Sequence, residues 1–347
     1  MKKKFIGLLT AAFFAALADL LLSGVIVKNN AGTMQSSYRE YDRHYALITD
    51  REDSEFWDKV YDSAKEAGEE SNVYVERFGE NLSEKYDRLT LLQLAIDAKV
   101  DGIIFAGDES DETRDLVNKA VENGIPVVTV LNDSAGSTRQ CYVGTNNYTL
   151  GHEYAEQVKE LLEKKEEKAS DEATEILVLT DKEQLDVSQN LILLGIRETL
   201  KQEMGEDYSL DVETKLIDNT GEFSAEEAIR DIFIDSEELP DIIICLSELN
   251  TKCAYQAVVD YNQVGNVNIL GFYNSDSVLE AVSKNIVNAT ITLDTDQMGS
   301  YSVQALNEYI TTGHTNAYQA VDTQLITKEE ASELLANGEA ADSNENE

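Results

Sequence analysis

Residues suited to hydrogen bonding and ring stacking gather at six places in the chain, each directly after a run of apolar residues. These segments are rich in Asp, Asn, Ser, Glu and aromatic residues, and they span residues 50–57, 107–111, 132–137, 180–189, 247–250 and 273–276. Carboxylates, amides and hydroxyls hydrogen-bond to the polar groups of a ligand, and aromatic rings stack on its apolar faces. This composition indicates a binding site for a small polar molecule.

Catalytic chemistry has no comparable support in the sequence. It contains no G-x-G-x-x-G after a strand-like run, no G-x-x-x-x-G-K followed by Ser or Thr, and no G-x-S-x-G. The three histidines are isolated, and His152 lacks the second histidine that a helical zinc site requires. We therefore predict a protein that is not an enzyme and needs no metal or cofactor. The alternative that stays open is glycoside hydrolysis by a pair of carboxylates, because 67 acidic residues offer many such pairs.

The net charge restricts the partners of the chain. Its 347 residues include 28 basic and 67 acidic ones, which gives a formal charge of −39. Such a surface repels phosphate backbones and anionic lipids, so we expect no nucleic-acid partner and no electrostatic attachment to a membrane. Because 42% of the residues are apolar, the chain can still form a core, and the charge indicates the solvated surface of an exported protein.

Strand-like and helix-like segments alternate through the body. The strands are predicted at residues 44–49, 72–77, 101–106, 126–131, 140–144, 175–180, 211–217, 241–246, 267–272 and 288–293. The helices are predicted at residues 54–68, 82–98, 110–123, 147–164, 185–204, 223–235, 249–263, 275–284 and 295–312. Apolar runs such as GIIF and PVVTV indicate strands buried on both faces, which is typical of parallel sheets covered by helices.

Ten strands in one open sheet would be at the upper end of the usual range, so we predict two sheets in two lobes. A weak internal repeat favours this division, because residues 101–130 and 241–270 share the order Asp, apolar strand, acidic loop, helix with Ala-Val, turn and apolar strand. In α/β sheets the loops at the carboxyl ends of the strands form the binding crevice. The six polar segments all occupy such positions.

The N-terminus carries a membrane-spanning signal. Residues 5–27 are apolar except for Asp19 and follow the basic sequence MKKK. As a helix this segment is about 34 Å long, which is enough to cross a bilayer with the lysines in the cytoplasm. A cleaved signal peptide is the alternative, although no good small-x-small cleavage site follows. We predict a signal anchor at 1–29, a linker at 30–43 and a flexible acidic tail at 328–347.

Several stretches resemble type I periplasmic binding proteins of the ribose-binding kind. They are HYALITDREDSEFWDKVYDSAKEAG, DGIIFAGDES with AVENGIPVVTVLNDS, YVGTNNYTLGHEYAEQV, and the late run VNILGFYNSDSVLEAVSKNIVNATITLDTDQMGSYSVQAL. The resemblance covers roughly residues 44–327. It implies two doubly wound parallel-sheet lobes joined by a three-strand hinge that closes on a ligand. The implied lobes are 44–145 plus 294–318 and 146–293 plus 319–327.

The resemblance also implies ligand contacts. Phe56 and Trp57 match the aromatic pair that sandwiches the sugar ring, and Asn132 and Asp133 match the polar loop after the fourth strand. From the loops after the sixth, eighth and ninth strands we add four further residues, which are Gln189, Glu248, Asn250 and Tyr273.

Four positions depart from the family pattern. Ile192 replaces an Arg, Glu248 replaces an Asn, Tyr273 replaces an Asp, and Leu293 replaces a Gln. A less polar and more aromatic pocket with one acid would suit a glycoside, a signalling molecule or a cationic ligand better than a standard monosaccharide. The implied function is binding of a sugar-like solute for an ABC importer. The alternative is a sensing module coupled to a membrane sensor kinase or a chemoreceptor.

Overall fold

The computed structural model describes most of the predicted body. The described residues are 40–49, 54–164, 173–182, 187–204, 210–219, 221–235 and 239–345. The predicted signal anchor and most of the predicted linker lie outside them. In the part of the chain that is described, no helix is long and apolar enough to span a bilayer. The chain divides after Asp42, and the following description concerns the unit Arg43–Glu347.

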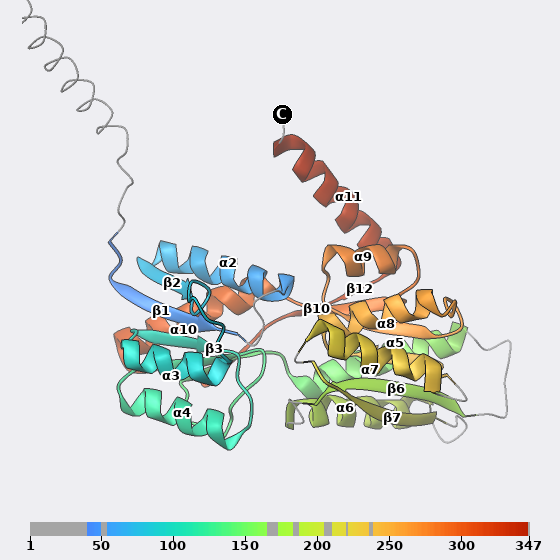
Figure 1. Ribbon diagram of the computed structural model, residues 1–347, viewed down its shortest axis with the longest axis horizontal. Helices are drawn as coiled ribbons and strands as arrows, with labels where there is room; N and C mark the ends of the chain where they lie inside the picture. Colours follow the sequence, from blue (N-terminus) through green and yellow to red (C-terminus); the bar gives the residue numbers. More distant parts are fainter. Residues whose placement is uncertain are drawn as a thin grey trace, which may run out of the picture. The chain divides into compact units, whose positions relative to one another are not determined.

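Two six-stranded sheets form this unit, in agreement with the predicted α/β fold of two parallel-sheet lobes (Figure 1). The first lobe contains the sheet β11-β5-β4-β3-β1-β2. Its strands are β1 (Arg43–Ile48), β2 (Val73–Arg77), β3 (Gly102–Phe105), β4 (Val127–Val130), β5 (Cys141–Gly144) and β11 (Tyr318–Ala320). All its strand pairs are parallel, and β3 and β4 are buried at every residue.

The second lobe contains the sheet β12-β10-β9-β8-β6-β7, which is antiparallel only at β12. Its strands are β6 (Thr174–Asp181), β7 (Leu210–Ile217), β8 (Ile242–Cys245), β9 (Asn268–Phe272), β10 (Ala289–Leu293) and β12 (Thr323–Ile326). The strand orders of the two sheets correspond position by position. The two halves of the internal repeat in the sequence therefore correspond to equivalent units of the two sheets. One runs from β3 to β4 and the other from β8 to β9.

Helices cover both faces of the first sheet. On one face, α2 (Glu55–Glu70) and α10 (Thr295–Thr312) pack over Tyr45 and Leu47, and on the other lie α3 (Arg88–Ala98) and α4 (Asp111–Glu122). The helix predicted from residue 82 begins only at Arg88, because Asp87 accepts a hydrogen bond from the Thr90 N–H and fixes the first turn there.

The second sheet is covered by α5 (Asn147–Lys164) and α6 (Val187–Met204) on one face. Three helices, α7 (Glu222–Asp235), α8 (Glu248–Asp260) and α9 (Asp276–Ser283), pack on the other face. Gly151 and Gly195 let α5 and α6 approach closely, since a Cβ at Gly151 would lie 2.2 Å from the Ile192 carbonyl oxygen.

The chain passes between the lobes three times, after β5, after β10 and between β11 and β12. These crossings are hydrogen-bonded to one another. The Val321 N–H donates to the Gly144 carbonyl at 2.9 Å, and the Asp294 N–H donates to the Asp322 carbonyl at 3.0 Å. Gln297 bonds Asp322 twice, donating to its carboxylate at 2.8 Å and accepting from its N–H at 3.0 Å.

The segment predicted as an acidic tail contains a helix. The residues after β12 form α11 (Lys328–Glu345), and Ala331 and Leu335 pack on the core of the second lobe. Two apolar positions one turn apart are enough to anchor the first turns of this acidic helix.

The cysteines are all inside the protein. Cys141, Cys245 and Cys253 are buried thiols that do not form disulfides with one another. Burial raises the pKa of the Cys141 thiol to about 11, although Arg139 acts against this shift. Burial likewise raises the pKa of the Cys245 thiol, so both remain protonated at neutral pH.

Candidate functional site

In each sheet, one residue with a positive φ follows a strand at the edge where the predicted site residues lie. Leu131 follows β4 with φ 66°, and Tyr273 follows the equivalent strand β9 with φ 72°. Non-glycine residues adopt such angles only when neighbouring contacts hold them. Here the Leu131 N–H donates to the Val143 carbonyl at 3.1 Å, and the Tyr273 N–H donates to the Ile291 carbonyl at 2.8 Å.

Aromatic side chains from both lobes meet at this edge. The rings of Phe56 and Trp57, in the first turn of α2, have centroids 5.0 Å apart and lie edge to face. The Phe56 ring also contacts Tyr273 of the second lobe, with centroids 5.2 Å apart at 86°. Trp57 and Tyr273 are each only 3% exposed. The structure therefore brings three of the predicted ligand residues together, packed against one another.

Carboxylates from both lobes lie beside the aromatic group. Ser54, at the start of α2, donates from its hydroxyl to the Glu248 carboxylate of the second lobe at 3.3 Å. The same carboxylate pairs with Lys252 at 2.5 Å. Burial raises the pKa of Glu55, and the charges of Asp276 and Glu248 raise it further, against the opposing effect of Lys252. Glu55 thus lies within electrostatic range of two carboxylates from the opposite lobe.

The same elements bury polar atoms that have no partner in the described structure. Asn250 is 1% exposed, and its side-chain oxygen Oδ1 lacks a hydrogen-bond partner among the described residues. Ser275 is fully buried at the N-cap of α9, yet its hydroxyl neither caps the helix nor bonds to another described residue. Buried polar groups are nearly always satisfied, so these two side chains are exceptions at the starts of α8 and α9.

Asp133 has a structural role in the first lobe. Its carboxylate forms a two-pronged ion pair with Arg139, and it accepts hydrogen bonds from the Thr129 hydroxyl at 2.7 Å and the Ser134 N–H at 2.7 Å. These contacts fix the loop that carries Asn132, whose own N–H donates to the Val130 carbonyl at 2.8 Å. Asp133 acts by positioning this loop.

Gln189 bonds within the second lobe, where its side chain accepts from the Asp181 N–H at 3.2 Å. Ile192 is a core residue that packs with α5 and the second sheet. Leu293 packs among the buried residues around Phe56 and Tyr273.

Ser54, Glu55, Lys252, Ser275 and Asp276 belong to the site although the sequence did not single them out. Four of these five residues fall in the polar segments 50–57 and 273–276, so composition indicated the segments but not the individual side chains. Their contacts join residues far apart in the chain. In the described part of the protein, no group of three or more His, Cys, Asp or Glu side chains could hold a metal ion.

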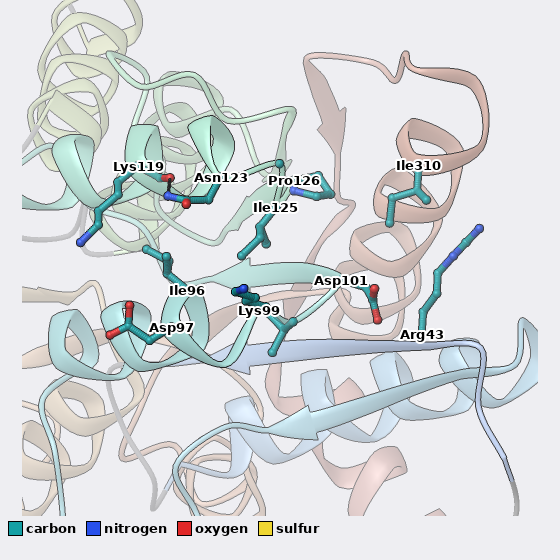
Figure 2. A pocket seen from close by; sticks show the side chains of 12 residues that line it. Arg43, Ile96, Asp97, Lys99, Asp101, Lys119, Asn123, Ile125, Pro126 and Ile310 are labelled. Carbon is teal, nitrogen blue, oxygen red and sulfur yellow. Dashed lines mark hydrogen bonds between the residues drawn. The ribbon is translucent and has the colours of Figure 1, made fainter.

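A surface pocket of about 630 Å³ lies elsewhere, at the opposite edge of the first sheet (Figure 2). Arg43 at the start of β1, Asp101 before β3 and Pro126 before β4 line it, so it lies at the amino ends of the strands. None of the eight predicted ligand residues lines this pocket.

The protein consists of two α/β lobes joined by three hydrogen-bonded crossings, and aromatic and polar side chains from both lobes meet at one edge. This is the architecture of a two-lobed binding protein. The periplasmic binding protein domain family matches residues 45–315. The chain therefore belongs to the periplasmic binding protein family, type I.

Solved structures agree with this assignment. GanP, a glucose-galactose binding protein from Geobacillus stearothermophilus, is 23% identical with TM-score 0.71, over 83% of this chain and 98% of GanP. An ABC transporter solute binding protein from Burkholderia graminis, in complex with D-arabinose, is 20% identical with TM-score 0.71, over 84% and 96%. These two likenesses concern the fold alone.

A chain from the XylFII-LytSN complex is 26% identical with TM-score 0.69, over 83% of this chain and 98% of that one. A comparison with curated proteins gives no match.

Proposed function

We propose that this protein binds a sugar-like small molecule outside the cytoplasm by closing its two lobes around it. The observation that carries the proposal is the meeting of side chains from both lobes at one edge. Phe56 of the first lobe contacts Tyr273 of the second, and Ser54 bonds to Glu248. A ligand that contacts both lobes stabilises their closed arrangement over the open one.

The closed complex would deliver its ligand to an ABC-type importer. This step is supported by the fold, which is shared with proteins named as sugar-binding and ABC transporter solute binding proteins. The apolar segment 5–27 would hold the body at the outer face of the cell membrane, or would be removed from a secreted protein. Cell fractionation, followed by N-terminal sequencing of the mature protein, separates these two forms.

A sensing role is the second candidate. It is supported by the 26% identical chain that was solved in the XylFII-LytSN complex, because that chain has a protein partner. In this case the closed lobes would signal to a membrane sensor kinase or a chemoreceptor. Tagged full-length protein purified in detergent, with and without ligand, should carry either an ABC permease or a sensor, identified by mass spectrometry.

A thermal-shift screen of the purified full-length protein in detergent tests binding directly. The screen covers sugars, nucleosides, amino acids and polyamines. A ligand at about 100 times its Kd adds about 2.7 kcal/mol to the free energy of unfolding, which is easily detected. A folded protein whose unfolding temperature no compound changes would contradict the proposal.

A further inference from the structure

Tyr273 of the second lobe packs against the aromatic side chains of the first. Its ring lies edge to face with that of Phe56, with centroids 5.2 Å apart, and the residue is 3% exposed. The buried apolar cluster that contains Phe56 and Trp57 also contains three side chains of the second lobe, which are Phe272, Tyr273 and Leu293. The apolar core of the first lobe therefore continues into the second through these side chains.

Backbone hydrogen bonds hold Tyr273 in this place. Its N–H donates to the Ile291 carbonyl at 2.8 Å, and its carbonyl accepts from the Thr290 hydroxyl at 2.7 Å. Both partners lie on β10, and Thr290 is fully buried. These two bonds stabilise the φ of 72°, which a residue with a side chain adopts only under such restraint. The main chain therefore presents the tyrosine ring to Phe56 from a fixed position.

The contact between the two rings leaves no space for a ligand between them. A ligand ring inserted there would need a contact distance of about 3.5–4.0 Å on each side, and so about 7–8 Å in total. The observed separation of the Phe56 and Tyr273 centroids is 5.2 Å. Trp57 and Phe272 surround the same ring, with centroids 5.0 and 6.3 Å from it, and Phe56 is only 4% exposed. A ligand can therefore stack on Phe56 only after the Tyr273 ring has moved away.

We propose that Tyr273 is a plug, a side chain that competes with the ligand for the Phe56 ring and so determines which ligands bind. The inference rests on the proposed binding function and concerns the same site. A protein whose binding-competent form is only a fraction of the population binds with an affinity reduced by that fraction. Tyr273 lowers this fraction by packing its ring on Phe56. Only a ligand with an apolar ring face, such as the C–H face of a pyranose, gains enough from Phe56 to displace it.

The fluorescence of Trp57 gives a first test, because this is the only tryptophan of the chain and its ring lies 5.0 Å from that of Phe56. Acrylamide quenching is measured on the full-length protein in detergent. Tyr273→Ala should raise the quenching constant, since water and acrylamide enter where the ring was, whereas Tyr273→Phe keeps the ring and should leave it unchanged. Tyr86→Ala is the matched control, because it removes a tyrosine that is 41% exposed. An unchanged quenching constant in Tyr273→Ala would overturn the inference.

Calorimetry with neutral sugars tests the competition itself. Glucose, galactose and arabinose are each titrated into the wild-type protein and into Tyr273→Ala. We expect the variant to bind at least one of them about tenfold more tightly, as it would if the plugged form outnumbered the open form by about ten to one. Tyr273→Phe should bind like the wild type. Tyr273→Leu repeats both measurements with a smaller loss of buried volume, in case Tyr273→Ala does not unfold cooperatively.

The outcomes separate this inference from the proposed function. Equal or weaker binding by the Ala and Leu variants, including no binding by any of the proteins, would overturn the plug. Sugar binding by the wild type without a gain in the variants would preserve the proposed function alone. If none of the three sugars binds, the wider ligand screen decides the proposed function separately.

Discussion

Trp57 belongs to the apolar core of the first lobe. Its indole is 3% exposed and packs with Phe56 in the apolar cluster of the first lobe. We expect Trp57→Ala to lower the free energy of unfolding by about 3–5 kcal/mol, because it removes a large buried side chain. Urea denaturation measures the change. The control Phe223→Ala, at a 75% exposed position, should stay within about 0.5 kcal/mol of wild type. An unchanged midpoint for the Trp57 variant would contradict this packing.

Asp108 makes the free energy of unfolding depend on pH in the acid range. Its burial acts to raise the pKa of the carboxyl, but Arg88 together with Ser110 and Thr113 outweighs burial and holds the pKa below its usual 3.8. A lowered pKa stabilises the fold above the unfolded value, and this contribution is lost as pH falls through the folded value.

Asp108→Asn should therefore destabilise the protein by about 3 kcal/mol at neutral pH, since Arg88 loses its buried partner. The difference from wild type should shrink as pH falls below about 3.8, which denaturation at several pH values measures. Asp115→Asn, at a side chain that is 76% exposed, should show neither effect. A constant difference at all pH values would argue against the ion pair as its source.

Side chains clamp the amino ends of both sheets in the same way. Asp101 accepts from the His44 N–H of β1 at 2.8 Å, and Asp241 accepts from the Glu175 N–H of β6 at 3.1 Å. These two aspartates begin the repeated segments found in the sequence. The internal repeat therefore preserves a structural hydrogen bond.

A second pair of clamps holds β4 and β9. The Val127 N–H donates to the Gln140 side chain at 2.6 Å, and the Ile269 N–H donates to the Asn288 side chain at 2.8 Å. Asn288→Ala leaves the buried Ile269 N–H unsatisfied and should cost about 1–3 kcal/mol in chemical denaturation. Asn266→Ala, which removes an exposed side-chain bond to Gln263, should be nearly neutral, and an equal loss in both variants would refute the clamp.

Elements stabilised by their own apolar residues could be predicted from the sequence, whereas elements that depend on pairing with distant strands could not. The strand Ile242–Cys245 was predictable because four consecutive apolar residues can only be buried in a covered sheet. The short strands β11 and β12 were missed, since they are half-exposed and exist through pairing with β5 and β10 far away in the chain. The site divides similarly, because loop composition indicated Phe56 and Glu248, whereas the hydrogen bond from Ser54 to Glu248 joins residues far apart in the chain.

At the level of the whole molecule, Phe56 links the two lobes. Its ring contacts Tyr273 at 5.2 Å and Phe272 at 6.3 Å, so it stabilises the arrangement in which the lobes touch. Phe56→Ala should shift the ligand-free protein toward open forms and raise its radius of gyration in small-angle X-ray scattering. Phe223→Ala is the control, and an unchanged radius in the Phe56 variant would contradict the link.

Because its three cysteines are buried, the folded protein should not react with thiol reagents. Thiols attack as thiolates, and burial keeps Cys141 and Cys245 protonated at neutral pH, while Cys253 is buried as well. A native protein should therefore take up almost no thiol-reactive dye, whereas the unfolded chain should take up three equivalents. Engineered cysteines at exposed positions of the two lobes could then carry a pair of fluorophores, and lobe closure could be followed by energy transfer without removing a native cysteine.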